Sequence, residues 1–285
     1  MTLPWDVDLP LVSSVFHPSD FTEASERAFA HALAVALIRQ TELTILHAAR
    51  GELEEEDWQR YPAVRRTLER WGLLEPGSSR SAVLEELSIR VRKVAVRGRD
   101  PFEAALEFVR EEEPDLIVLA TGGRSGLPRW VRPSRAERIA RRSRTMTLFG
   151  PEAARGFVDP ATGATSLRRI LVPVDQSPNP GEALLRATRI AEAIGERPVC
   201  IRTLHVGQGA AVPALPPNGE AWDFEAALRN GDVVEEILAE VRKFHADQLV
   251  LTTEGRQGVL DALRGSVTER VLRGLACPLL AIPAR

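Results

Sequence analysis

The stretch "RRILVPVDQSPNPGEALLRATRIAEAIG", residues 168–195, decides the fold because it carries one complete structural unit. An apolar strand leads into a turn that contains Pro and Asp, and the turn leads into an amphipathic helix. The stretch "LVSSVFHPSDFTEASERAFAHALAVAL", residues 11–37, has the same order and places Asp20 opposite Asp175. The sequence therefore predicts an internal repeat.

The repeat extends over most of the chain. The further matched segments are residues 42–48 and 199–206, 97–121 and 229–253, and 122–149 and 254–282. They place His47 opposite His205 and Asp100 opposite Asp232. Strands alternate with helices in both copies, and strands such as "DLIVLA" and "QLVLT" contain short continuous apolar runs. This pattern is typical of a parallel sheet covered by helices on both faces.

The copies differ in length between their second and third strands. Counted from the matched histidine to the matched aspartate, the second copy is shorter by 26 residues. Its remaining segment, "GQGAAVPALPPNGEA", is rich in proline. We therefore expect that the second copy lacks the helix between strands 2 and 3 and has a loop in its place.

A length of 285 residues predicts two domains of roughly 140 residues each. The repeat places the first domain at residues 1–150, a linker at 151–166 and the second domain at 167–285. Within the linker, "DPATG" has the residues of a tight turn and predicts a small hairpin.

Composition and residue spacing argue against several classes of protein. No apolar run approaches the roughly 20 residues that cross a bilayer, and "MTLPWDVDLP" does not resemble a secretion signal. We therefore expect a cytoplasmic protein with no membrane partner. The formal net charge of -3 makes nucleic acid an unfavoured partner, and the five histidines do not have the spacing of metal ligands. Cys200 and Cys277 lie in apolar runs and are expected to be buried thiols.

Glycines after the fourth strand of the second copy suggest an anion site. In open parallel sheets, ligands bind beyond the carboxyl ends of the strands, where the strand order reverses. Asp175 follows the first strand, and residues 252–255 follow the fourth. The next helix opens at Gly265 and Ser266, and its free N–H groups suit phosphate oxygens.

Each of these features also has a purely structural interpretation. Ser266 and Glu269 have the spacing of a capping box, and Gly255 can serve a backbone turn with positive φ. Asp175, together with Ser177, can cap the first helix of the second copy. The residues of this loop do not decide between the two interpretations.

The whole chain resembles a tandem universal stress protein. The resemblance rests on "ILVPVD" at the first strand of the second copy, "TEGRQG" and "GSVTERVL" around the fourth loop, and "CPLLAIP" at the last strand. The loop pattern of that family is Gly, two residues, Gly, nine residues, Gly, then Ser or Thr. With this spacing it falls on Thr252, Gly255, Gly265 and Ser266, so three of four positions match.

The resemblance implies two Rossmann-like α/β domains, each with a five-stranded parallel sheet of order 3-2-1-4-5, joined as an internal pseudo-dimer. It also implies binding of ATP or another adenine nucleotide, with Mg²⁺ as a possible companion. In nucleotide-binding members, the residues matching Pro173, Val174, Asp175 and Val206 hold the base end of the ligand. The implied phosphate-binding residues are Leu251, Thr252, Gly255, Gly265, Ser266, Val267 and Thr268.

Departures from the family pattern affect both copies. Thr252 replaces the first glycine, and its hydroxyl can donate to a phosphate while its methyl group can crowd one. Glu254 adds a negative charge to the loop. In the first copy the pattern falls on Ala120, Gly123, Pro133 and Ser134, beside Asp20. Pro133 has no N–H to donate, so we expect the first site to be degenerate.

An arginine-rich segment follows the fourth strand of the first copy. Its members are Arg124, Arg129, Arg132, Arg135, Arg138, Arg141, Arg142 and Arg144. They form either a solvated helix face or a surface for an anion or a protein partner. His47 and His205 end matched strands, where packing is the favoured interpretation because no nucleophile accompanies them.

Taken together, these features favour a stress-associated nucleotide-binding sensor or regulator over an enzyme, with the ligand mainly in the second domain. The alternatives are a ligand-independent scaffold for an unknown protein partner and, less favoured, a slow ATPase. The last strands, "TMTLF" and "PLLAI", are expected to form an interface, either inside the chain or in a homodimer.

Overall fold

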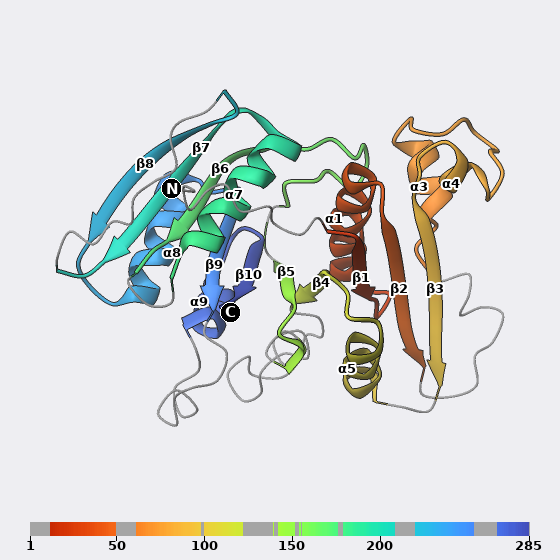
Figure 1. Ribbon diagram of the computed structural model, residues 1–285, viewed down its shortest axis with the longest axis horizontal. Helices are drawn as coiled ribbons and strands as arrows, with labels where there is room; N and C mark the ends of the chain where they lie inside the picture. Colours follow the sequence, from red (N-terminus) through yellow and green to blue (C-terminus); the bar gives the residue numbers. More distant parts are fainter. Residues whose placement is uncertain are drawn as a thin grey trace, which may run out of the picture.

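The computed structural model contains a single ten-stranded sheet with helices on both faces (Figure 1). It describes residues 12–49, 61–97, 100–121, 139, 142–151, 154, 156–175, 179–208, 220–253 and 267–284. Across the sheet the strands run in the order β3-β2-β1-β4-β5-β10-β9-β6-β7-β8. The order 3-2-1-4-5 predicted for each copy is therefore confirmed, because β8-β7-β6-β9-β10 repeats it in the second half.

The first half has five strands, β1 to β5. Its elements are β1 (Ser14–Pro18), α1 (Glu23–Arg39), β2 (Glu42–Ala49), α3 (Val64–Arg70), α4 (Ala82–Glu85), β3 (Arg90–Arg97), α5 (Pro101–Glu112), β4 (Leu116–Thr121) and β5 (Met146–Pro151). Neighbouring strands within this half pair in parallel. The helix predicted between β4 and β5 falls mainly outside the described residues.

The second half repeats the arrangement with fewer helices. Its elements are β6 (Leu167–Pro173), α7 (Gly181–Ile194), β7 (Gly195–Val206), β8 (Trp222–Arg229), α8 (Val233–Phe244), β9 (Gln248–Thr253), α9 (Val267–Gly274) and β10 (Leu279–Pro283). Between β7 and β8, the described residues 207–208 and 220–221 contain no helix, whereas α3 and α4 occupy this connection in the first half.

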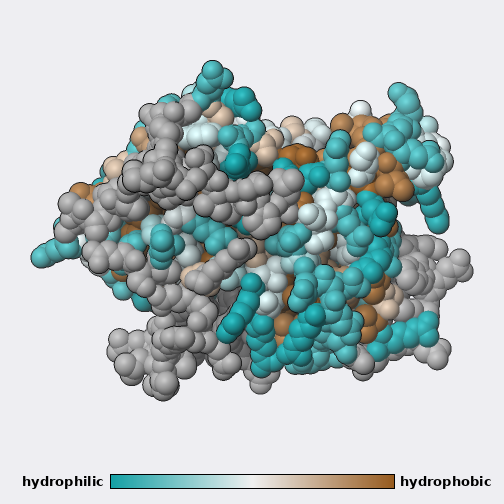
Figure 2. Space-filling model, in the orientation of Figure 1, coloured by the Kyte–Doolittle hydropathy of each residue, from teal (hydrophilic) through white to brown (hydrophobic). Residues whose placement is uncertain are grey.

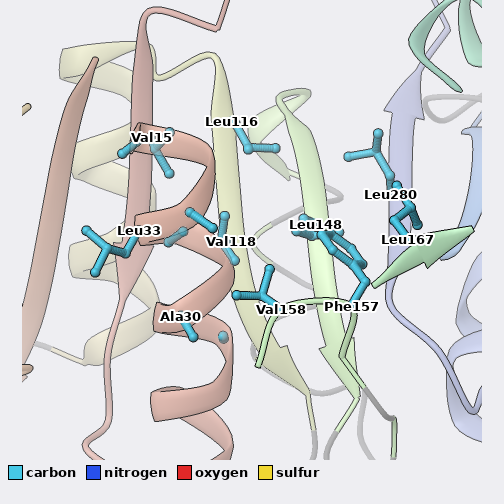
Figure 3. Close-up of a cluster of buried hydrophobic side chains, with 14 of the residues drawn as sticks. Val15, Ala30, Leu33, Leu116, Val118, Leu148, Phe157, Val158, Leu167 and Leu280 are labelled. Carbon is cyan, nitrogen blue, oxygen red and sulfur yellow. The ribbon is translucent and has the colours of Figure 1, made fainter. Parts of the chain in front are cut away.

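The two halves are joined edge to edge. β5 and β10 pair antiparallel, with Leu148 opposite Leu280 and with flanking pairs on either side. The interface predicted for the last strands is therefore internal to the chain. Figure 3 shows Leu148, Phe157 and Leu280 gathered where the halves meet.

Each face of the sheet has one apolar core that continues across this junction. The first core contains Leu33 of α1 and Ala187 of α7, together with Leu148 and Leu280 between them. The second core lies on the other face, where α5, α8 and α9 supply residues such as Leu106, Ile237 and Val271. Side chains of both halves contribute to both cores, so neither half buries its apolar surface alone.

Matched aspartates accept backbone hydrogen bonds from the amino ends of the central strands β1 and β6. Asp115 Oδ2 accepts N–H bonds from Ser13 and Ser14, at 2.8 and 3.1 Å. Asp247 Oδ2 accepts N–H bonds from Arg168 and Arg169, at 2.8 and 2.9 Å. Both carboxylates precede the fourth strand of their half and hold its neighbour in register.

The hairpin predicted from "DPATG" is present in the linker. Val158 and Thr165 form an antiparallel bridge, and the turn between them packs on α3. There, Trp71 Nε1 donates to the carbonyl oxygen of Pro160 at 3.1 Å. Gly163 has a φ of +73°, and any β-carbon at this position would stand 2.4 Å from the Trp71 ring. The turn therefore requires glycine.

Truncating the central pair of the β5–β10 junction should destabilise the whole chain. Leu148 and Leu280 are 3% and 4% exposed, and each change to alanine should cost about 2–5 kcal/mol of unfolding free energy. Because the two side chains meet, the double variant should differ from the sum by about 0.5–3 kcal/mol. Urea unfolding measures these values. The matched control Leu84→Ala, at a site 51% exposed, should change stability by less than about 0.5 kcal/mol. Additive losses would contradict direct packing across the junction.

Candidate functional site

The switch point of the second half, meaning the place where the strand order reverses, lies at the carboxyl end of β6. This strand pairs in parallel with β7 on one side and with β9 on the other. Pro173, Val174 and Asp175 therefore follow one another at an edge flanked by Val206 of β7 and by the end of β9. Leu251 and Thr252 occupy that end. The structure thus brings six of the predicted site residues to one edge of the sheet.

The predicted phosphate-binding segment is described in part. Gly255, Gly265 and Ser266 lie outside the described residues, and Glu254 does too. Val267 and Thr268 open helix α9. In the second turn of α9, Arg270 Nη2 donates to both carboxylate oxygens of Asp232 at 3.3 Å.

Asp232 anchors α9 beside the start of α8. Its Oδ1 accepts the N–H groups of Val234 and Glu235, which makes it the N-cap of α8. These hydrogen bonds and the Arg270 guanidinium lower the pKa of the Asp232 carboxyl. The Arg270–Asp232 ion pair therefore links the start of α9 to the start of α8.

The interpretation of Asp175 as a helix cap is wrong. Helix α7 begins five residues later, at Gly181, with Pro180 at its N-cap position. The side chain that serves its first turn is Asn179, whose Oδ1 accepts the N–H of Gly181 at 2.8 Å. Pro180 at the N-cap position sets the start of the helix, and Asp175 is an exposed residue just after β6.

Thr252 has a buried hydroxyl without a hydrogen-bond partner among the described residues. Its neighbour Thr253 differs, since that hydroxyl donates to the carbonyl oxygen of Ile282 at 3.3 Å. Buried polar atoms in folded proteins are nearly always paired with protein or water, so this hydroxyl at the strand end has a hydrogen bond left to donate.

His205 and His47 have the same structural role in the two halves. His205 Nδ1 donates to the carbonyl oxygen of Val174 at 3.2 Å. His47 Nδ1 donates to the matched carbonyl of Ser19 at 2.8 Å. Each ring therefore ties the end of the second strand to the residue after the first, which agrees with the packing interpretation.

Asp20 is engaged in a local turn. Its Oδ1 accepts the N–H of Thr22 at 3.1 Å and the hydroxyl of the same residue at 2.6 Å. Thr22 in turn caps α1 by accepting the N–H of Ser25. Of the other predicted residues of the first site, Ala120 lies in β4, while Gly123, Pro133 and Ser134 lie outside the described residues.

Comparison with known proteins gives the family. Residues 15–149 and 214–283 match the universal stress protein family. The chain belongs to this family. Universal stress protein MJ0531 of Methanocaldococcus jannaschii is 27% identical over 143 residues, which cover 42% of this chain and 84% of that protein.

Solved structures share the fold at low sequence identity. A universal stress protein from Archaeoglobus fulgidus matches with a TM-score of 0.63 and 16% identity, covering 95% of this chain and 96% of its own. A shorter universal stress protein, solved in complex with cAMP, covers 49% of this chain and 97% of its own, with 20% identity and a TM-score of 0.37.

Aromatic rings occupy the first switch point of this universal stress protein. The ring of Phe21, directly after Asp20, stacks on His47 with centroids 3.9 Å apart and planes 20° apart. Tyr61 meets Phe21 edge-on at 5.2 Å. The sequence analysis missed this cluster. The sequence feature that could have predicted the cluster is the phenylalanine that directly follows Asp20.

A chain of buried polar groups lies beneath that cluster. His17 Nδ1 donates to the carbonyl oxygen of Val118 at 2.9 Å, and Nε2 lies 3.3 Å from Ser25 Oγ. Ser25 Oγ lies 2.9 Å from Ser19 Oγ. Burial lowers the pKa of His17 to about 4, so the ring is neutral at pH 7. At the matched position the second half has Val172.

A buried ion cluster in the second half is structural. Glu240 of α8 is 2% exposed, and its two carboxylate oxygens accept hydrogen bonds from Arg202 and Arg229 at 2.8 and 2.7 Å. All its charge is paired, which makes a ligand role unfavoured. The sequence signal was an acid at a buried helix position between Ile237 and Phe244.

The two cysteines and Arg142 of the arginine-rich segment, which the sequence analysis singled out, contact groups of the protein itself. Cys277 is buried as predicted, whereas Cys200 is only half-buried. Desolvation raises the pKa of Cys200 to about 11 and of Cys277 to about 12, so both thiols are protonated at pH 7. Arg142, one of two described members of the arginine-rich segment, lies 5.2 Å from the centre of the Phe102 ring. In the described part of the chain, no group of His, Cys, Asp or Glu could hold a metal ion. Nor does that part include a helix long and apolar enough to span a membrane.

An apolar groove of about 360 Å³ lies away from both switch points. Its walls come from the last turns of α1 and α7, the loop after α3, and the linker hairpin. Figure 2 shows apolar residues at the surface around α3 and α4, where Leu73 is 43% exposed. The charged residues of the candidate sites do not line this groove.

Removing the His17 ring should weaken the acid sensitivity of stability. The unfolded His17 has a pKa near 6.5 and the folded one near 4, so between these values only the unfolded chain binds the proton. Stability is therefore lost as pH falls through this window, by roughly 3 kcal/mol. His17→Asn should remove this contribution, measured by urea unfolding from pH 7 to 4. His245→Asn, at a helix C-cap with positive φ, should keep it. Equal slopes in both variants would contradict the assignment.

Proposed function

We propose that this universal stress protein binds an adenine nucleotide at the switch point of its second half and acts as a sensor or regulator through the occupancy of that site. The proposal places it in the cytoplasm. It assigns the chain a binding role, with slow ATP hydrolysis as the less favoured alternative.

The orphan hydroxyl of Thr252 supports the proposal most directly. It is buried at the end of β9, one strand away from Asp175 at the end of β6. A donor in this position can reach a phosphate oxygen, while a carboxylate after β6 can accept from the base or ribose of the same ligand. The hydroxyl interpretation of Thr252 is therefore favoured over crowding by its methyl group.

Asp175 adds independent support. Pro180 occupies the cap position of α7 and Asn179 serves its first turn, so Asp175 is not needed as the cap of this helix. Its exposed carboxylate follows Val174, whose carbonyl oxygen is held by His205. A fixed backbone beside an exposed acceptor is the arrangement that ligand recognition requires.

The phosphate end of the ligand is assigned by the family pattern. In this proposal Gly255, Gly265 and Ser266 supply N–H groups and a hydroxyl, and the N-terminus of α9 adds its partial positive charge. Mg²⁺ would enter with ATP, bound by the phosphates. The first half contributes little, because Asp20 already accepts two hydrogen bonds from Thr22.

Calorimetry with AMP, ADP and ATP tests the proposal. The unaltered chain should bind one equivalent, and Asp175→Ala should weaken binding about tenfold because one hydrogen-bond acceptor is lost. Thr252→Val should have a similar effect, whereas Thr252→Ser keeps the hydroxyl and should bind nearly as well as the unaltered chain.

The control is Thr253→Val, which removes a hydroxyl that the protein already uses. It should leave the affinity unchanged. Absence of heat at millimolar nucleotide, or equal affinity for the Val and Ser variants of Thr252, would refute the proposal. Phosphate release that disappears in Asp175→Ala would instead support the ATPase alternative.

A further inference from the structure

Three aromatic rings fill the edge where a ligand of the first half would bind. Ligands of open parallel sheets occupy the space beyond the carboxyl ends of the central strands. In the first half these ends belong to β1 and its neighbours β2 and β4, and on the β2 side Phe21 stacks on His47 with ring centroids 3.9 Å apart. Tyr61 closes the cluster from the side and is 3% exposed.

Hydrogen bonds to backbone carbonyl oxygens hold two of the three rings, His47 and Tyr61. His47 donates to the carbonyl oxygen of Ser19, which fixes the ring plane on which Phe21 lies. Tyr61 donates its hydroxyl to the carbonyl oxygen of Val94 on β3 at 2.7 Å. His47 and Tyr61 also meet each other edge-on, with centroids 6.2 Å apart, and Phe21 covers the face of the His47 ring beside Tyr61.

Phe21 reaches this position at a conformational cost. Its φ is +59°, in the left-handed region that a bulky side chain rarely adopts. Strain of this kind persists where the surroundings impose it, and it is common at ligand clamps. The contacts of the ring with His47 and Tyr61 offset the strain.

The second half does not have these aromatic residues at matched positions. The residue after Asp175 is Gln176, and the shorter connection between β7 and β8 has no counterpart of Tyr61. His205, the match of His47, is kept. The ring that would receive a stacked partner is thus present in both halves, and the phenylalanine is present in the first.

We propose that Phe21 is an intramolecular substitute for a planar heteroaromatic ligand, and that it blocks a purine-sized site on His47 in the first half. The contact is autoinhibitory, since a ring from solution can stack on His47 after Phe21 is removed or displaced. This inference concerns the first half and does not depend on nucleotide binding by the second.

Free adenine is the probe, because it can stack without needing a phosphate site. The experiments use the full chain with Asp175→Ala, so that the second half contributes little. Phe21→Gly should open the site while keeping the backbone, because glycine accepts a φ of +59°. Stacking on an aromatic ring predicts that adenine binds this variant about tenfold more tightly than it binds the parent.

Two further variants protect the test against a folding defect. Phe21→Asn also tolerates positive φ and should open the site, while Phe21→Leu keeps an apolar filler and should stay closed. Thermal unfolding checks that each variant is folded. Calorimetry gives the affinity, and the NMR shifts of the His47 ring locate the adenine by its ring current.

The decisive control is His47→Ala in the Phe21→Gly chain, which should abolish the gain in adenine affinity. If the gain survives without His47, or if folded Phe21→Gly and Phe21→Asn bind adenine no better than Phe21→Leu, the inference is wrong. Loss of nucleotide binding by the second half would leave this result unchanged, so the two failures are distinguishable.

Discussion

The antiparallel pairing of β5 with β10 is the contact on which the rest of the structure depends. It turns two five-stranded sheets into one and lets both apolar cores continue from one half to the other. It also separates the switch points, because β4, β5, β10 and β9 lie between β1 and β6. At a strand spacing of about 4.8 Å, the two central strands are roughly 24 Å apart across the sheet. A nucleotide-sized ligand therefore cannot contact both switch points at once.

The two halves keep the residues that build the sheet and differ in those at the switch points. Asp115 and Asp247 make the same backbone hydrogen bonds, and His47 and His205 make the same strand-end bond. In contrast, Phe21 is matched by Gln176. A scaffold contact tolerates little change because unpaired backbone groups are costly, whereas a switch-point residue can change as long as something fills or hydrates the space. This difference supports separate roles for the two sites.

The sequence predicted the parts of the fold that follow from local pattern. Apolar strands alternating with helices gave the parallel sheet, "DPATG" gave the linker hairpin, and the resemblance gave the strand order. It did not reveal that Pro180 delays α7, that Glu240 is buried between two arginines, or that Phe21 adopts positive φ. The first depends on the local geometry of a proline-containing turn, and the other two depend on contacts between residues far apart in the chain. A capping preference cannot show which turn residue the helix will use, and a charge pattern cannot show which acid will find partners.

The shorter connection in the second half explains why its switch point differs from the first. In the first half, the segment between β2 and β3 supplies Tyr61 to the aromatic cluster and α3 and α4 to the sheet. A chain that loses 26 residues here loses the edge that supports a filling ring, and a phenylalanine after Asp175 would then stand on His205 without Tyr61 beside it. A positive φ like that of Phe21 would then be offset by fewer ring contacts. The shorter connection and the absence of a phenylalanine after Asp175 are thus linked differences between the two switch points.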